Sequence, residues 1–175
     1  VLCLVDMWDV NKRYLYDGQF VEKIEQTRTF EPTETDKQIL LDKDLNYRVL
    51  NLASNTFNEN NTSYWHKSIG GYHAAKLRRY QEMIEAHIAP EMRTVMEEVV
   101  RTGGQMDSIQ GSKFPVLNML NTRWFIMPTQ GGGTMPLANP YALGNAWFVN
   151  DVKYVANANE EIAALSVIDP ATTAV

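Results

Sequence analysis

The stretch Tyr47–Leu52, YRVLNL, decides the fold class, because it is short, near-continuously apolar and bounded by polar residues. Such a run predicts a strand that is buried on both faces, as in the sheets of α/β proteins. Arg123–Met127, RWFIM, predicts a second strand of this kind, closed by Pro128. Ala146–Val155 adds strand material, either as one bulged strand or as a hairpin that turns at Asn150-Asp151.

Helical patterns alternate with these strands. Tyr72–Ile88 predicts a helix, because apolar residues recur along it at three- and four-residue spacing. These residues are Leu77, Tyr80, Ile84 and His87/Ile88. Pro90 either kinks this helix or begins a second one, whose apolar stripe lies in Met92–Val99 and which ends at Gly103-Gly104.

Shorter helices complete the pattern. We expect a helix through Ile39–Leu41, behind the capping-box spacing of Thr35 and Gln38, a short helix or a turn at Phe114–Leu120, and a last helix directly after Asn157. Strands that alternate with helices predict the α/β class. The expected architecture is a mixed or mostly parallel sheet flanked by helices, in a single domain that covers the whole stretch.

Both ends of the sequence predict a cut inside a larger polypeptide. Leu2–Trp8 is an apolar run rich in strand formers, and we expect a first strand there, with the tail of a membrane helix as the alternative. Asn11–Glu31 is mixed and polar, and is expected to be irregular. Thr172–Val175 looks like the beginning of another strand.

Composition excludes several classes of protein. The 175 residues include 16 Lys and Arg against 21 Asp and Glu, a net charge of −5, which argues against broad nucleic-acid binding. The 45% hydrophobic and 21% charged residues are values of a globular chain and exclude disorder. The single cysteine, Cys3, excludes an internal disulfide framework and a cysteine-rich zinc site.

Familiar catalytic and cofactor motifs are absent from the sequence. Gly131–Thr134 lacks the ending of a P-loop and the third glycine of a dinucleotide fingerprint, so Gln130–Pro140 is expected to be a flexible Gly/Pro loop. His66, His73 and His87 are too scattered to predict a metal site, and no nucleophile elbow occurs. We therefore expect no cofactor, no metal and no catalytic residue in this stretch.

The densest group of functional side chains joins the long polar loop Ala53–Gly71 to the start of the expected helix. Its members are Tyr64, Trp65, His66, Lys67, Gly70, Gly71, Tyr72 and His73. Aromatic rings can stack on a sugar, while imidazoles, an amine and the free N–H groups of a helix start can hold hydroxyls or phosphate. The favoured interpretation is a loop folded back on its own sheet, with the aromatic residues as plugs and the glycines as a turn. The alternative is a carbohydrate or lipid-phosphate contact site formed by these residues.

Five segments of the sequence resemble one protein family. They are Trp65–Glu82 (WHKSIGGYHAAKLRRYQE), Tyr47–Leu52, Pro115–Ile126 (PVLNMLNTRWFI), Asn139–Val149 (NPYALGNAWFV) and the stretch from Asp6-Met7-Trp8 through Arg13-Tyr14-Leu15. In these segments the chain resembles the large extracytoplasmic domain of the YfhO family of bacterial polytopic membrane proteins, particularly its Bacteroidetes members. The likeness covers nearly all of the stretch.

This resemblance implies a parent protein similar to GT-C-type glycosyltransferases, which take sugar from a polyprenyl-phosphate carrier on the outer face of the membrane. The expected partners are the membrane helices of the parent and a polyprenyl-phosphate sugar or envelope glycan. The catalytic acid of such an enzyme lies in an early extracytoplasmic loop outside this stretch, so no residue here inherits that role. The function implied is that of an accessory domain on the periplasmic side. Two alternatives stay open: a non-catalytic structural or interaction module, and a free-standing small enzyme.

Overall fold

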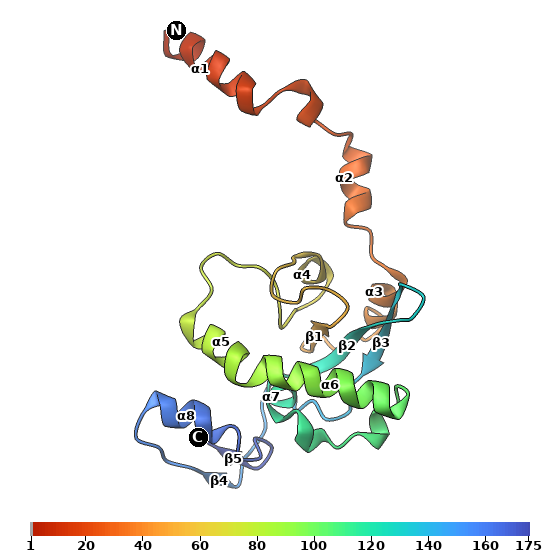
Figure 1. Cartoon of the computed structure of the whole chain (residues 1–175), viewed down its shortest axis with the longest axis vertical. Coiled ribbons are helices and arrows are strands. Elements are labelled where there is room, and N and C mark those ends of the chain that lie inside the picture. The colour runs from red at the N-terminus through yellow and green to blue at the C-terminus, as the bar shows by residue number, and fades with distance from the viewer. Residues whose placement is uncertain (1) are drawn as a thin grey trace. The chain divides into compact units, whose positions relative to one another are not determined.

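A three-stranded mixed sheet organises the larger part of the chain (Figure 1). β1 (Arg48–Asn51) runs parallel to β2 (Thr122–Pro128), and β3 (Thr134–Ala138) pairs with β2 in the antiparallel direction. The structure is a computed structural model that describes residues 2–175. It confirms the α/β class and a mixed sheet flanked by helices. The chain divides into two compact units, of which the first ends at Glu31 and the second begins at Pro32.

The edge strand β3 corrects one expectation. Gln130–Pro140 was predicted to be a loop, but its second half pairs with β2, and Pro136 lies opposite Ile126 in the register. Proline removes one ladder donor, and a strand at the edge of a sheet tolerates this loss. The glycines that precede β3 form the turn of the hairpin, so only the first half of the segment is a loop.

One face of the sheet is covered by a long helical run. α5 (Arg78–Met83) passes through a single π-helical turn, η2 (Ile84–Ile88), into α6 (Ala89–Thr102), which ends at Gly103 in a left-handed conformation. Pro90 therefore lies in the first turn of α6, and the glycine stop is confirmed. Leu50, Phe125 and Met127 from the strands pack against buried residues of this helical run in one hydrophobic cluster.

The opposite face of the sheet is covered by a short helix, α3 (Glu34–Ile39). Ile39 packs there against Tyr47, Val49 and Ile126. The helix was predicted, but its cap was not. Thr33 caps the helix and forms a capping box with Asp36, because the expected cap, Thr35, is buried and donates instead to the backbone oxygen of Thr134.

Shorter elements complete the second unit. They are α4 (Asn61–Trp65), η3 (Met106–Ser108), η4 (Gly111–Lys113), α7 (Pro115–Met119), β4 (Asp151–Val152), α8 (Ala158–Ala164) and β5 (Thr173–Ala174). The predictions of α7, of α8 behind Asn157 and of a terminal strand at β5 are confirmed. Strand structure was expected over Ala146–Val155, but only the two residues of β4 form a strand there, and they pair with β5 in parallel.

The first unit is helical and shows that the strand predicted at Leu2–Trp8 is wrong. α1 (Leu2–Tyr14), η1 (Asp17–Gln19) and α2 (Lys23–Thr29) account for most of it, so Asn11–Glu31 is not simply irregular either. The residues of α1 are exposed, and none of the strand pairings found among residues 2–175 involves them. A helix satisfies its backbone groups internally, which explains this outcome. Among residues 2–175, no helix is both long and apolar enough to cross a membrane.

Candidate functional site

The segment that sequence analysis singled out, residues 64–73, folds back along the sheet. Val49 of β1 donates its N–H to the Lys67 oxygen at 2.9 Å, and Ile69 donates to the Val49 oxygen at 2.9 Å. Ser68 thereby forms a parallel bridge with Val49 on the side of β1 that faces away from β2. This is the geometry of a loop that closes on its own sheet.

His66 is buried within this segment and faces α3. Its Nε2 lies 2.9 Å from Oδ1 of Asp36, and the other oxygen of Asp36 accepts from the hydroxyl and the backbone N–H of Thr33. Burial alone would raise the pKa of Asp36, but the Thr33 hydrogen bonds and His66 outweigh burial and lower the pKa of Asp36 below its ordinary value. His66 thus connects the end of α4 to the capped start of α3.

The remaining polar members of the segment point to different places. Lys67 donates from its ammonium to the Leu45 oxygen at 2.5 Å. Tyr64 is exposed and makes an edge-to-face contact with Trp65, with ring centroids 5.1 Å apart. Tyr72 and His73 lie on an exposed stretch of loop.

The helix expected to begin at Tyr72 begins only at Arg78. Its cap, Leu77, has no hydroxyl or amide with which to close the first turn. The loop therefore continues past His73, and the first free N–H groups of the helix belong to residues that begin at Arg78 and not at Tyr72.

The paired glycines make the close backbone contact that their sequence suggested. A Cβ on Gly70 would lie 2.0 Å from the backbone oxygen of Thr56, so only glycine fits there. Gly71 has φ of +108° and donates its N–H to the same Thr56 oxygen at 2.7 Å. The glycines thus hold the segment that follows β1.

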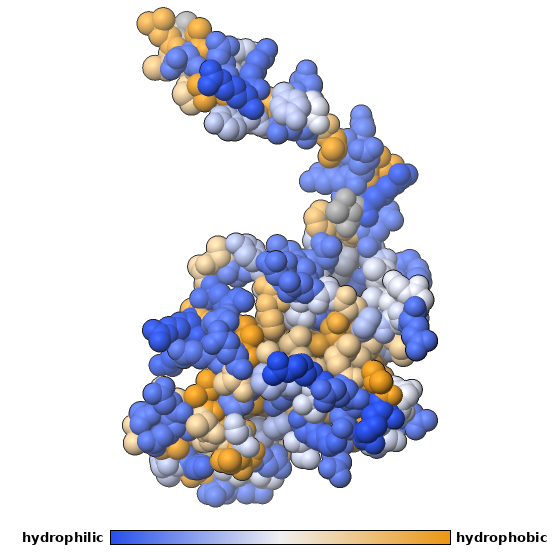
Figure 2. All heavy atoms as spheres, viewed as in Figure 1, coloured by the Kyte–Doolittle hydropathy of each residue, from blue (hydrophilic) through white to orange (hydrophobic). Residues whose placement is uncertain are grey.

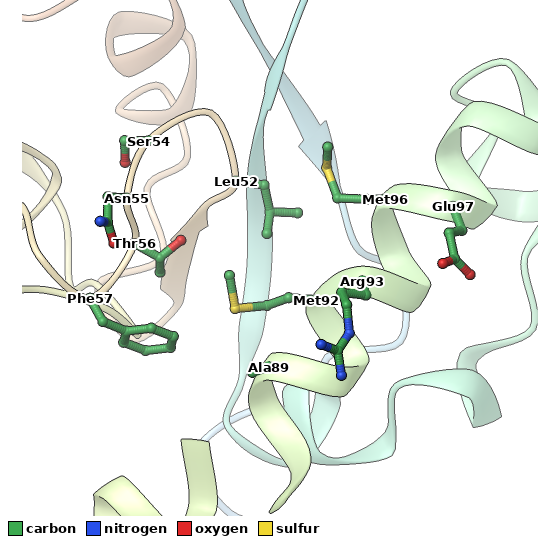
Figure 3. Close-up of a pocket in the computed structure, with 10 residues that line it drawn as sticks. All are labelled: Leu52, Ser54, Asn55, Thr56, Phe57, Ala89, Met92, Arg93, Met96 and Glu97. Atoms are coloured by element: carbon green, nitrogen blue, oxygen red, sulfur yellow. The ribbon is translucent and has the colours of Figure 1, made fainter. Parts of the chain in front are cut away.

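That segment forms one wall of a surface groove of about 520 Å³, shown in Figure 3. Residues 52–57 leave the carboxyl end of β1, and residues 89–97 of α6 form the opposite wall. Crevices outside the carboxyl ends of strands are the usual place for ligands in α/β sheets. The groove is therefore the strongest candidate site among the described residues.

The floor of the groove is apolar. Leu52 and Phe57 contribute from the strand side, and Ala89, Met92 and Met96 form a stripe along α6. In Figure 3 the Met92 side chain extends from α6 toward Phe57. Figure 2 shows apolar residues gathered on this face beside the polar outer surface of the helix. Unbranched, polarisable methionines adapt to irregular apolar ligands.

The rim of the groove is polar, and part of it is unpaired. Within residues 2–175, the side chains of Ser54, Asn55 and Arg93 make no hydrogen bond or ion pair. Glu97 lies one helical turn after Arg93, yet the two do not form an ion pair in this structure. The guanidinium of Arg93 is therefore available to an anionic or hydroxylated group above an apolar floor.

Sequence reasoning missed this groove, although two signals were present. Met92 and Met96 were predicted only as part of the apolar stripe of a helix, and Ala53–Phe57 only as part of the polar loop Ala53–Gly71. The loop directly after a buried parallel strand was the usable signal. The predicted and the observed sites are nevertheless in contact, because Gly70 and Gly71 both contact Thr56, which lines the groove.

Comparison with known proteins finds no matching family model, no matching curated protein and no matching solved structure. Among the residues that the structure describes, no three His, Cys, Asp or Glu side chains are grouped closely enough to hold a metal ion.

Proposed function

We propose that this chain is an extracytoplasmic accessory domain of a YfhO-like membrane protein, and that it assists the transfer of sugar from a polyprenyl-phosphate carrier to a cell-envelope acceptor. The observation that carries this proposal is the groove between residues 52–57 and α6. Its apolar floor and the unpaired Arg93 at its rim suit a ligand with an apolar chain and an anionic head. The sequence resemblance supplies the identity of that ligand.

The geometry of the groove supports a holding role. Ala89 and Glu97 are eight residues apart on α6, so the helical wall is about 12 Å long. An apolar segment of that length would lie along the methionine stripe and bring a phosphate to the guanidinium of Arg93. Ser54 and Asn55 on the facing wall offer a hydroxyl and an amide to sugar hydroxyls.

The test is sugar transfer by the intact parent protein carrying Arg93→Gln, with Arg79→Gln as the matched control. Both arginines are exposed on the same helical run, and neither makes an ion pair within residues 2–175, but only Arg93 borders the groove. We expect labelled sugar incorporation to fall at least several-fold for Arg93→Gln and to stay unchanged for Arg79→Gln, at equal expression. Equal activity of both variants would refute the proposal.

A non-catalytic interaction module is the second candidate, and one observation favours it. Leu2, Leu4 and Trp8 of α1 are 62% exposed or more, so this helix presents uncovered apolar side chains. Large exposed apolar surfaces mark sites of contact with partners. A photo-crosslinker at Trp8 in the intact protein tests this candidate. A crosslink to another chain, with normal sugar transfer by Arg93→Gln, would favour the module over the ligand-holding domain.

A further inference from the structure

A second pocket, of about 400 Å³, lies at the other end of the sheet from the groove. Its walls come from Asp44, which precedes β1, from the amino end of β2, and from the last residue of β3 and the loop that follows it up to Gly144. We call it the polar pocket, because amide, carboxylate, guanidinium and indole groups line it: Asn121, Asn139, Asp44, Arg123 and Trp124. Its volume lies within the range of about 300–1,000 Å³ that is usual for small-molecule sites.

The charged groups of the polar pocket hold one another in place. Arg123 makes ion pairs with Asp42 through Nε and with Asp44 through Nη1, each at 3.0 Å. Asp42 Oδ2 also accepts from the indole N–H of Trp124 at 3.0 Å. A planar guanidinium fixed in this way keeps the N–H groups of Nη2, which no other described residue uses, in a set orientation.

The amides are fixed in the same manner. Asn121 lies in the left-handed region, with φ of 57°, and its Nδ2 donates to the backbone oxygen of Asn46 and to Oδ1 of Asn145. Asn139 donates both N–H groups and accepts one, so it is structural. Within the part of the chain that the structure describes, Oδ1 of Asn121 accepts no hydrogen bond. It is thus an unused acceptor in the same pocket as the unused Arg123 donor.

These groups select the chemistry of the ligand. Two carboxylates face one guanidinium, so the local charge is negative and disfavours a phosphate or another anion. Vicinal hydroxyl groups both donate and accept, which matches a fixed array of guanidinium, carboxylate and amide groups. The half-buried indole of Trp124 adds an apolar surface beside this array. We infer that the polar pocket is a binding site for an uncharged saccharide, separate from the groove and independent of its proposed ligand.

The test uses the full 175-residue chain and a panel of uncharged sugars: methyl glycosides of glucose, galactose and mannose, and N-acetylglucosamine. Two-dimensional NMR with isotope-labelled protein follows each titration. We expect saturable binding of at least one sugar, with shifts concentrated at the indole N–H of Trp124 and the side-chain amide of Asn121. The mapping on the unmodified chain tests the proposal even where a variant does not fold.

Asn121→Gly removes the amide while keeping the left-handed backbone, and Arg123→Lys keeps the charge but removes the planar fork. Each is expected to weaken binding about tenfold, the order for one lost hydrogen bond. Asn150→Gly, at an exposed loop position outside both the polar pocket and the groove, is the matched control and should leave binding unchanged. Absence of saturable binding by every sugar, shifts confined to the groove, or equal loss with Asn150→Gly would each overturn the inference.

Discussion

His66 Nε2 lies 2.9 Å from Asp36 Oδ1, although the two residues are 30 positions apart in the chain. The side chain of His66 is 1% exposed, so this contact joins two segments in the interior rather than at the surface. We predict that His66→Ala lowers the free energy of unfolding by about 1–3 kcal/mol, because it leaves a buried carboxylate oxygen without its partner. Urea unfolding followed by circular dichroism measures this loss.

His73→Ala is the matched control for that experiment. His73 is exposed, and its ring accepts the N–H of Ala75, two residues away. Its replacement should change the free energy of unfolding by less than about 0.5 kcal/mol. Similar losses for both variants would show that the contact with Asp36 contributes little to stability.

Gly70→Ala is predicted to be strongly destabilising. The new methyl group would meet the backbone oxygen of Thr56 at 2.0 Å, and a backbone atom cannot move aside cheaply. Overpacking of this kind typically costs about 1–3 kcal/mol. Gly131→Ala is the control, since no atom lies within 4 Å of its Cβ position. Thermal unfolding should show a lower Tm for Gly70→Ala only, and equal Tm values would contradict the close contact.

Glu91 is predicted to make stability depend on pH near neutrality. It is buried on α6 and accepts the N–H groups of Val116 at 3.0 Å and Leu117 at 2.8 Å, at the start of α7. Burial raises the pKa of Glu91 from 4.5 to about 7, against the opposing effect of the two hydrogen bonds. The folded chain therefore binds more protons than the unfolded chain between these two values.

The sign of the effect follows from that proton balance. The contribution of Glu91 to the free energy of unfolding is greatest below pH 4.5 and is lost as the pH rises through about 7, by about 3 kcal/mol at most. Glu91→Gln has no ionisable group at this position. The difference in the free energy of unfolding between the unmodified chain and this variant should therefore fall by this amount as the pH rises from 4.5 to 7. Parallel stability curves across that range would contradict the prediction.

The groove is predicted to bind an anionic amphiphile in the isolated chain. Dodecyl phosphate, used below its critical micelle concentration, offers an apolar chain to Met92 and Met96 and a phosphate to Arg93. Arg93→Gln should weaken binding about tenfold, because a charge-assisted hydrogen bond is lost, whereas Arg79→Gln should not. Isothermal titration calorimetry gives both values, and undetectable binding to the unmodified chain would remove the groove as a lipid-phosphate site.

The sequence predicted those elements whose cause is local. The apolar run of YRVLNL, the glycine stop at Gly103 and the cap at Asn157 each contain their own signal, and the structure confirms all three. β3 was missed because its pairing with β2 outweighs the local effect of Pro136. The segment Leu2–Trp8 was assigned the wrong structure because an apolar run of that length fits a strand or a helix equally well, and the deciding factor is whether a neighbouring strand exists.

The candidate site was predicted only in part, for a related reason. Gly70 and Gly71 indicated a close backbone approach, and the structure shows that approach. Their contact partner could not be predicted, because Thr56 lies 14 residues before Gly70 and no sequence motif links the two positions. Asp36, the partner of His66, could not be predicted for the same reason, because only the folded sheet brings α3 beside the end of α4.

The π-helical turn Ile84–Ile88 has an evolutionary consequence. Such a turn contains one residue more than an α-helical turn, so it rotates everything that follows by about 100° relative to an uninterrupted helix. A lineage that lost one residue here would gain a regular helix, yet Met92 and Met96 would turn away from Leu52 and Phe57. A single-codon deletion in this turn would therefore turn a different face of α6 toward Leu52 and Phe57 while the sheet beneath it stayed the same.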